Sequence, residues 1–376
     1  MPQIISPVLS PPLLLATDGS SSAHLAQRLV RPIAELFQTQ AEWKPRSPIG
    51  NASPLLTVLT VQPRVSNRSR FSKQITHAHL QKQGDSPTAT LESDAISTNG
   101  STGFIPSLEN LTALVEMDFS ADFPMSLEIR QGRPAPEILN CARTLQAGLI
   151  AVGHRGGGGM RELLLGSVST AIARYAPCSV LVARSAAEAL PKPSLSHVLL
   201  VVDSSPATRQ AIAATCQLIP AGIRQITLLH VQAPLNANYL IGPFVSPTPS
   251  WQLNQSLQTV QKEQGERILQ QARANLDNAK DNANLEIHTR MQTGDPGPLI
   301  CQVAQEQEIN LVILGSDLTR RSLLSPLHAI RSPRRESKEQ TNPPPVLRNT
   351  RLSITEDYVI HYAPCPVLLC RTTQPS

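Results

Sequence analysis

Short runs of hydrophobic residues alternate with stretches of helical spacing along the first half of this chain of 376 residues. The runs are rich in Leu, Val and Ile, and turn-forming residues follow most of them. They predict strands at residues 13–17, 55–61, 127–131, 149–153 and 179–183. Helical spacing of the apolar positions predicts helices near 21–38, 135–146 and 167–175. Continuous apolar strands that alternate with helices are typical of a parallel sheet covered on both faces.

The second half repeats this pattern. We predict strands near 197–202, 225–231, 285–291, 310–315 and 366–370, and a long helix from about 251 to 280. The stretch "LLLATDGSSSAHLAQRLV" has a counterpart in "VLLVVDSSPATRQAIAAT", and "RYAPCSVLVAR" returns as "HYAPCPVLLCR". The sequence therefore predicts one α/β fold written twice, as two tandem open parallel five-stranded sheets with helices on both faces.

The repeat also predicts the domain organisation. We expect a first domain over residues 1–184, a linker over 185–196 and a second domain over 197–376. Each domain holds one polar insertion, at about 63–122 in the first and about 318–350 in the second. Because the insertions lack an apolar period over most of their length, we expect them to be disordered.

Two polar segments, 63–84 and 318–348, each carry a formal charge of +5, and the rest of the chain carries about −5, which gives the net charge of +5. The basic charge therefore belongs to the insertions and not to the body of the protein. One hypothesis that this leaves open is a scaffold whose basic insertions bind a protein or nucleic-acid partner.

The apolar stretches and the cysteines indicate the compartment. No apolar stretch reaches the length of about 18 residues that spans a bilayer, and no basic region precedes the apolar stretch near the amino terminus. We therefore expect a cytoplasmic protein without a membrane partner. The six cysteines form no C-x-x-C pair, and most of them fall in apolar or helical patterns, which predicts reduced, buried thiols that contribute to packing.

Glycines gather in "VGHRGGGGMRELLLGSVST", residues 152–170. Ligands of open parallel sheets bind beyond the carboxyl ends of the strands, and Gly153 lies at that end of the fourth predicted strand. A glycine there lets another molecule approach the main chain, and Gly156 can adopt the positive φ that a tight exit needs. Gly166 and Ser167 then begin a helix, whose free amides and hydroxyl suit an anion. The stretch therefore predicts a phosphate site.

Two other glycine motifs fail on spacing. The Walker A motif needs Lys-Ser or Lys-Thr after its second glycine, and the dinucleotide motif finds Arg161 or Glu162 where its third glycine belongs. The spacing that fits is G-x2-G-x9-G-[ST]. His154, Arg155 and Arg161 lie in the intervening loop and could add donors, but no carboxylate is visibly placed to make His154 a catalytic base.

This glycine spacing, with "LLLATDGS" at the start of the domain and "GRPAPEIL" after the third strand, resembles the ATP-binding branch of the universal stress protein family in its tandem two-domain form. The resemblance covers all but the insertions, the linker and the termini. It implies the strand order 3-2-1-4-5 and a two-fold pairing of the last strands. In this chain that pairing could join the two halves to each other, or two chains as a homodimer.

The resemblance also implies an adenine nucleotide as the ligand, ATP or the related AMP or ADP, with a divalent cation accompanying the phosphates. Asp18 would face the adenosine end, the backbone around Val61 would meet the adenine, and Gly153 would pass the ribose. The phosphates would be held by Gly156, Gly166, Ser167 and Val168.

The second half departs from this pattern. Leu318 stands where the second glycine belongs, and Ser353 and Ile354 replace Gly166 and Ser167. Because a side chain then occupies each contact, we expect the second half to bind triphosphate weakly or not at all and to act as a structural partner.

The leading hypothesis is therefore a nucleotide-binding protein of stress response or signalling. The alternative enzyme hypothesis is a slow ATPase or a nucleotidyl-transfer protein. It ranks second because the sequence offers no general base, acidic metal-binding cluster or lysine for the phosphates. The stress, the protein partner and the number of chains in the assembly are not specified by the sequence.

Overall fold

The computed structural model describes residues 8–39, 54–62, 119, 123–154, 165–184, 194–234, 250–279, 284–317 and 352–371. The two predicted insertions, 63–122 and 318–350, lie outside the described residues apart from Phe119, as does most of the linker. The disorder expected of the insertions therefore stays a prediction.

The described elements follow the predicted alternation. The first half consists of β1 (Leu13–Ala16), α1 (Ser21–Thr39), β2 (Leu56–Gln62), β3 (Met125–Gln131), α3 (Pro134–Leu145), β4 (Leu149–Gly153), α4 (Ser167–Tyr175) and β5 (Ser179–Ala183). The second half consists of β6 (His197–Val201), α5 (Pro206–Leu218), the short 3-10 helix η1 (Ile219–Ala221), β7 (Gln225–Gln232), α7 (Ser250–Asn278), β8 (Glu286–Thr293), α8 (Pro296–Glu306), β9 (Leu311–Gly315), α9 (Ile354–Tyr362) and β10 (Val367–Cys370). Every predicted strand is present.

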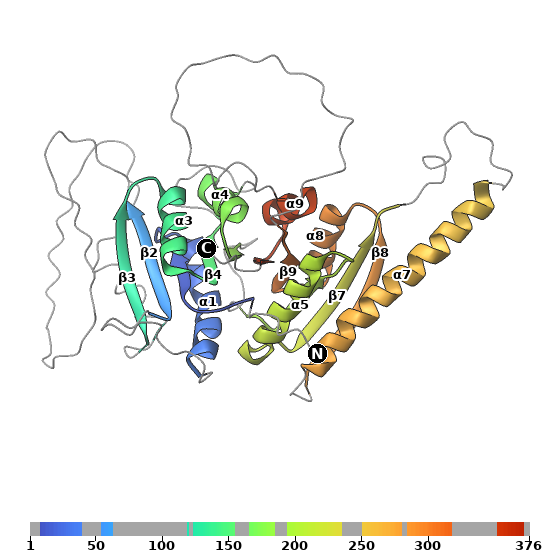
Figure 1. The fold of residues 1–376 in the computed structure, drawn as a ribbon, viewed down its shortest axis with the longest axis horizontal. Helices are drawn as coiled ribbons and strands as arrows, with labels where there is room; N and C mark the ends of the chain where they lie inside the picture. The colour runs from blue at the N-terminus through green and yellow to red at the C-terminus, as the bar shows by residue number, and fades with distance from the viewer. Residues whose placement is uncertain are drawn as a thin grey trace, which may run out of the picture.

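The strands form one continuous sheet in the order β3-β2-β1-β4-β5-β10-β9-β6-β7-β8 (Figure 1). Strands within each half are parallel, whereas β5 and β10 pair antiparallel, with Leu181 opposite Leu368. The α/β fold is thus confirmed, and the two predicted sheets are joined edge to edge through their last strands. The expected pairing of the two halves occurs within the chain.

Two apolar cores cover the two faces of this sheet. On one face, α1, α5 and α7 pack against the strands, and on the other face α3, α4, α8 and α9 do so. Alternate residues of β5 serve the two cores, since Leu181 points into the first and Val180 and Val182 into the second. Each core runs through both halves, so the junction at β5 and β10 is buried on both faces.

Proline fixes the start of one helix in the first half and two in the second. Pro134, Pro206 and Pro296 are the first residues of α3, α5 and α8, where the missing N–H costs no helical hydrogen bond. The C-cap of α3 is Gln146, whose φ of 53° is left-handed. These residues mark where the helices begin and where α3 ends.

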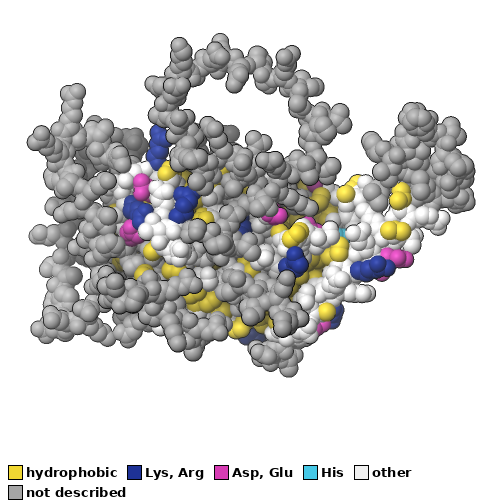
Figure 2. Space-filling model, viewed as in Figure 1, with side chains coloured by type: hydrophobic (Ala, Val, Ile, Leu, Met, Phe, Trp, Pro, Cys, Tyr) yellow, Lys and Arg dark blue, Asp and Glu magenta, His cyan; other side chains and the backbone are white. Residues whose placement is uncertain are grey.

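The long helix α7 lies over β7 and β8 at the outer end of the second half (Figure 1). Its buried face includes Leu269, Ala272 and Leu276. Its outer face carries charge pairs one turn apart, Lys262–Glu266, Arg267–Glu263 and Arg273–Asp277. Basic and acidic side chains accordingly lie next to each other along this helix in the space-filling view (Figure 2).

Candidate functional site

The predicted site lies at the carboxyl edge of the first half, where β1 leads into α1. Asp18 follows β1 and is exposed, and its carboxylate accepts a hydrogen bond of 3.0 Å from the Ser20 N–H. The Ser20 hydroxyl in turn accepts from the Ala23 N–H at 3.3 Å, so Ser20 caps the helix. Asp18 therefore shapes the turn before α1.

Val61 lies near the carboxyl end of β2, beside this turn. It is half-buried and pairs with Arg130 of β3. The neighbouring strand β1 places Ala16 between Leu59 of β2 and Val152 of β4. The ends of β2, β1 and β4 therefore meet at one edge of the sheet, as the prediction requires.

Gly153 ends β4, and the start of α1 lies directly against it. A Cβ atom built on Gly153 would be 2.5 Å from the Ser22 Oγ and 2.7 Å from the Ala23 backbone nitrogen. Gly315, its counterpart at the end of β9, would collide in the same way with the backbone of Ala207 at the start of α5. Helix packing thus accounts for the glycine in both halves, and the ribose contact of Gly153 stays a prediction.

The start of α4 is bound to the end of β4. The Gly166 N–H donates to the His154 carbonyl at 2.8 Å, and the Ser169 hydroxyl donates to the Gly153 carbonyl at 2.6 Å. Gly166 is the N-cap of α4, with φ −63° and ψ 149°. As a glycine it brings no side chain to the amides of the first turn. The N-cap of α4 therefore has no side chain that could accept a hydrogen bond from these amides.

The other predicted phosphate contacts begin the same helix. Ser167 is exposed and Val168 is half-buried, with the Val168 side chain against the apolar core of that face. Gly156 lies outside the described residues, together with Arg155 and Arg161. The described residues of the predicted site, Asp18, Val61, Gly153, Gly166, Ser167 and Val168, thus share one edge of the sheet.

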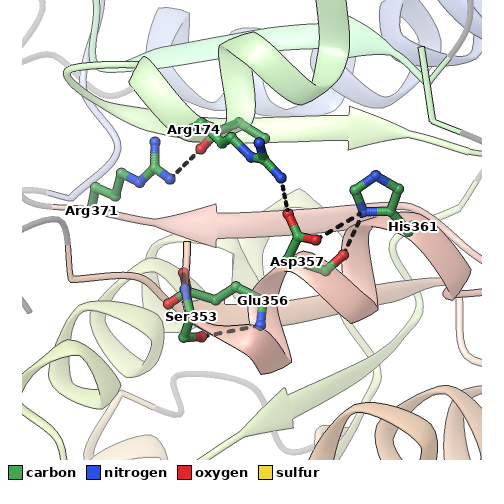
Figure 3. Close-up of polar contacts among 7 residues, drawn as sticks. Arg174, Ser353, Glu356, Asp357, His361 and Arg371 are labelled. Carbon is green, nitrogen blue, oxygen red and sulfur yellow. Dashed lines mark hydrogen bonds and ion pairs between the residues drawn. The ribbon is translucent and has the colours of Figure 1, made fainter. Parts of the chain in front are cut away.

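The counterpart helix α9 begins differently. Its N-cap is Ser353, whose hydroxyl accepts the Glu356 N–H at 3.1 Å, while the Glu356 carboxylate accepts the Ser353 N–H at 3.0 Å (Figure 3). This reciprocal arrangement is a capping box. Ile354, which takes the place of Ser167, is 89% exposed. Two donors at the amino terminus of α9 are therefore already used by the protein's own side chains.

Glu356 is buried, and burial raises the pKa of its carboxyl group above the ordinary value. The hydrogen bond with Ser353 and the positive charge of Arg371 oppose this rise. The S-x-x-E pattern from Ser353 to Glu356 is a sequence signature of such a cap. This cap was not predicted from the sequence, where only the loss of the glycine at position 353 was considered.

Arginines at the ends of the two last strands cross the junction. Arg371 follows β10 and is 1% exposed. Its guanidinium donates to the carbonyls of Ala173 and Ala176 at the carboxyl end of α4, and Figure 3 shows Arg371 pointing to α4. Arg184, its counterpart after β5, donates to the His361 carbonyl at the carboxyl end of α9. Each half thus holds the last helix of the other.

A second contact between the halves lies nearer the surface. The Arg174 guanidinium of α4 and the Asp357 carboxylate of α9 are 2.8 Å apart (Figure 3). Both side chains are about 40% exposed, so solvent weakens their attraction. Sequence reasoning gave no role to these arginines, although Arg184 and Arg371 end the repeated phrase in both halves.

The burial predicted for all six thiols is confirmed for Cys141, Cys178, Cys365 and Cys370 and is wrong for Cys216 and Cys301, which are only half-buried. Burial raises the pKa of Cys141, Cys178 and Cys365 to about 12, which agrees with the packing role expected of them. Among the described residues, no group of three or more His, Cys, Asp and Glu side chains could hold a metal ion. Within the same ranges, no helix is long and apolar enough to span a membrane.

Comparison with known proteins relates this architecture to named relatives. Universal stress protein YxiE of Bacillus subtilis is 47% identical over 53 residues, which are 14% of this chain and 36% of that protein. A universal stress protein of Mycolicibacterium smegmatis is 26% identical over 189 residues, which are 50% of this chain and 58% of that protein. The chain thus spans less than two thirds of the length of these relatives.

The fold recurs in solved structures. A universal stress protein from Archaeoglobus fulgidus aligns over 98% of this chain and 100% of its own, with a TM-score of 0.50 and 14% identity. A functionally unknown protein from Pseudomonas aeruginosa aligns over 96% of this chain and 92% of its own, with a TM-score of 0.53 and 14% identity. The model of the universal stress protein family matches residues 85–184 and 195–327. Because these two segments make up more than half of the sequence, the chain belongs to the universal stress protein family.

Proposed function

We propose that the first half binds an adenine nucleotide, ATP or the related AMP or ADP, and that the protein acts in stress response or signalling through this binding. The nucleotide lies at the carboxyl edge of β1, β2 and β4. Asp18 faces its adenosine end, the backbone around Val61 meets the adenine, and Gly153 passes the ribose. The phosphates, with a divalent cation, lie at Gly156 and at the amino terminus of α4.

The observation that carries this proposal is the contrast between the two last helices. The N-cap of α4 is Gly166, which adds no side chain to the amides of Ser167 and Val168, whereas α9 has a complete capping box. Amides at a helix amino terminus bind anions because their partial positive charge adds to that of the helix dipole. At α4 the Gly166 N–H is already bonded to the His154 carbonyl, so a phosphate would bind the amides of Ser167 and Val168, which follow a cap without a side chain.

The same contrast supports a division of labour between two domains, residues 1–184 and residues 197–376. An anion at α9 would have to displace the Glu356 carboxylate, which is hydrogen-bonded to the Ser353 N–H. It would also meet the exposed side chain of Ile354. The second domain is thus proposed to support the first and not to bind phosphate itself.

The first experiment asks whether the ligand exists. The full chain is purified gently and denatured, and any released nucleotide is identified by mass. ATP binding is then measured by calorimetry with and without Mg²⁺. We expect an adenine nucleotide in the first measurement and binding in the second. A protein that releases none and takes up none would refute the proposal.

A matched pair of double variants locates the site. The variant Gly166→Val, Ser167→Ala places Val-Ala at the start of α4, and Ser353→Val, Ile354→Ala places the same two residues at the start of α9. The φ and ψ of Gly166 suit any residue, so the first variant changes the contact and not the backbone. We expect the affinity for ATP to fall at least about tenfold in the first variant and to stay unchanged in the second. Equal affinities in the two variants would place the ligand elsewhere.

A further inference from the structure

We propose that Arg371, a residue of the second half, is a positioning residue for the nucleotide site in the first half. It acts by holding the carboxyl end of α4, the helix whose amino terminus faces the phosphates. The inference rests on the proposed function, because it concerns how that site is kept in place.

The contacts of Arg371 are directed at α4 and at the loop after β9. Its guanidinium donates to the Ala173 carbonyl in the last turn of α4 and, at 3.3 Å, to the Ala176 carbonyl at the C-cap. Its Nε donates to the Ser316 hydroxyl at 3.1 Å. A cation at the carboxyl end of a helix is favourable, because the carbonyls there carry the negative end of the helix dipole. These bonds fix both the guanidinium and the helix end.

Glu356 of the second half stabilises the charge of Arg371. The side chain is almost fully buried, and this burial lowers the pKa of Arg371 to about 10, while the Glu356 carboxylate opposes the shift. Ser169, the residue at the matching position of α4, instead donates to the Gly153 carbonyl. The residue that closes the amino terminus of α9 therefore also supports the arginine that holds α4.

The helix α4 is short and moves as a rigid unit, so a shift at its carboxyl end also moves its amino end. The nine residues of α4 span about 13 Å at the usual rise of about 1.5 Å per residue. Its amino end is bound to β4 through Gly166 and Ser169, and its carboxyl end is bound through Arg371. A tilt allowed at the carboxyl end would turn the amides of Ser167 and Val168 away from the phosphates, and small misplacements of this kind weaken binding strongly.

Arg184 provides a matched control. It occupies the same position in the repeat and is also buried, but it donates to the His361 carbonyl at the end of α9. A substitution of Arg184 therefore disturbs the same junction while it loosens the helix that does not face the phosphates.

The experiment measures ATP and adenosine binding to the full chain and to the variants R371M, R184M and R371K. We expect R371M to lower the affinity for ATP about tenfold or more and to leave the affinity for adenosine within about twofold, because only the phosphate end depends on α4. R184M should leave both affinities within about twofold of the parent chain, and R371K should recover part of the ATP affinity, because its ammonium still carries charge to the carbonyls.

Equal losses of ATP affinity in R371M and R184M would overturn the inference, as would an equal loss of ATP and adenosine binding in R371M. If R371M does not fold, S316A is used instead, because it removes the hydroxyl that orients the Arg371 guanidinium. The affinities for ATP and adenosine are then compared in S316A, and the affinity for ATP alone should fall. If the parent chain binds no ATP, the proposed function fails. The anchoring is then judged by amide hydrogen exchange, which R371M should speed in α4 and R184M in α9. Faster exchange of α9 in R371M, or equal changes in both helices, would refute the anchoring.

Discussion

Leu181 of β5 lies directly opposite Leu368 of β10 in the antiparallel pair that joins the two halves. Both side chains are buried in the same apolar core, and Leu368 also pairs with Ile313 of β9. The two halves therefore share a core at this point. The junction is hydrogen-bonded and buried like the other strand pairs of the sheet.

Substitution of Leu368 by Ala should destabilise the whole chain. The cavity left in a shared core should lower the free energy of unfolding by about 2–5 kcal/mol, and the described parts of both halves should lose their structure together. Urea unfolding followed by circular dichroism measures the loss, and hydrogen exchange follows each half. V260A on the exposed side of α7 is the control, with a change below about 0.5 kcal/mol. Separate unfolding of one half would contradict a shared core.

Replacement of Gly153 or Gly315 by Ala should reduce stability even without ligand. In each case the new Cβ would overlap backbone atoms at the start of α1 or α5, and such overpacking costs about 1–3 kcal/mol. Thermal unfolding of the two variants without nucleotide measures this effect. If G153A were as stable as the parent chain and differed only in nucleotide binding, the glycine would be explained by the ligand and not by the helix.

The burial of Glu356 predicts a pH dependence of stability. Burial raises the pKa of its carboxyl in the folded state above the ordinary 4.5, so the folded state holds the proton more tightly than the unfolded chain. The stability from this group is present below pH 4.5 and is lost as the pH rises through the folded pKa. The stability of the parent chain minus that of E356Q should therefore fall with rising pH in this window. Urea unfolding at a series of pH values measures it, and a difference that rises with pH would contradict the prediction.

The buried thiols should react slowly in the folded protein. Burial raises the pKa of Cys141, Cys178 and Cys365 to about 12, so little reactive thiolate exists near pH 8. We expect their reaction with a thiol reagent to be slower by about a hundredfold or more than in the urea-unfolded chain. Mass spectrometry of the labelled peptides measures each rate. Rapid labelling of Cys178 in the folded protein would show that the junction opens.

The fold could be predicted because its strands are short, continuous runs of apolar residues that are easy to recognise in the sequence. A run such as Leu149–Gly153 is buried along nearly its whole length, so it appears as continuous apolar residues without alternation. The repeat then gave each element a second, independent occurrence. The pairing of β5 with β10 could be expected only through the family resemblance, since no local pattern specifies which strand edges meet.

The site was less predictable, because the same residue type can have several different structural roles at one position. A glycine can be required because a ligand approaches the main chain or because a helix packs directly against it, and the sequence does not distinguish these two cases. Gly315 is of the second kind, since α5 packs against it in the half where no phosphate binding is predicted. Ser20 caps α1, but its neighbours Asp18, Ser21 and Ser22 are also residue types that cap helices, so no local pattern singles Ser20 out. The reach of Arg371 to α4 depends on the junction, so no pattern near residue 371 could reveal it.

The junction also decides how copies of this protein can meet. β5 and β10 are each flanked on both sides, so a second molecule can add a strand only beside β3 or β8, the outer strands of the described sheet. Both carry charged side chains that are at least partly exposed, Glu128 and Arg130 on β3 and Glu286 and Arg290 on β8. Charges on edge strands disfavour further strand addition. Pairing within the chain thus withdraws two apolar strand edges from contact with other copies and disfavours aggregation through them.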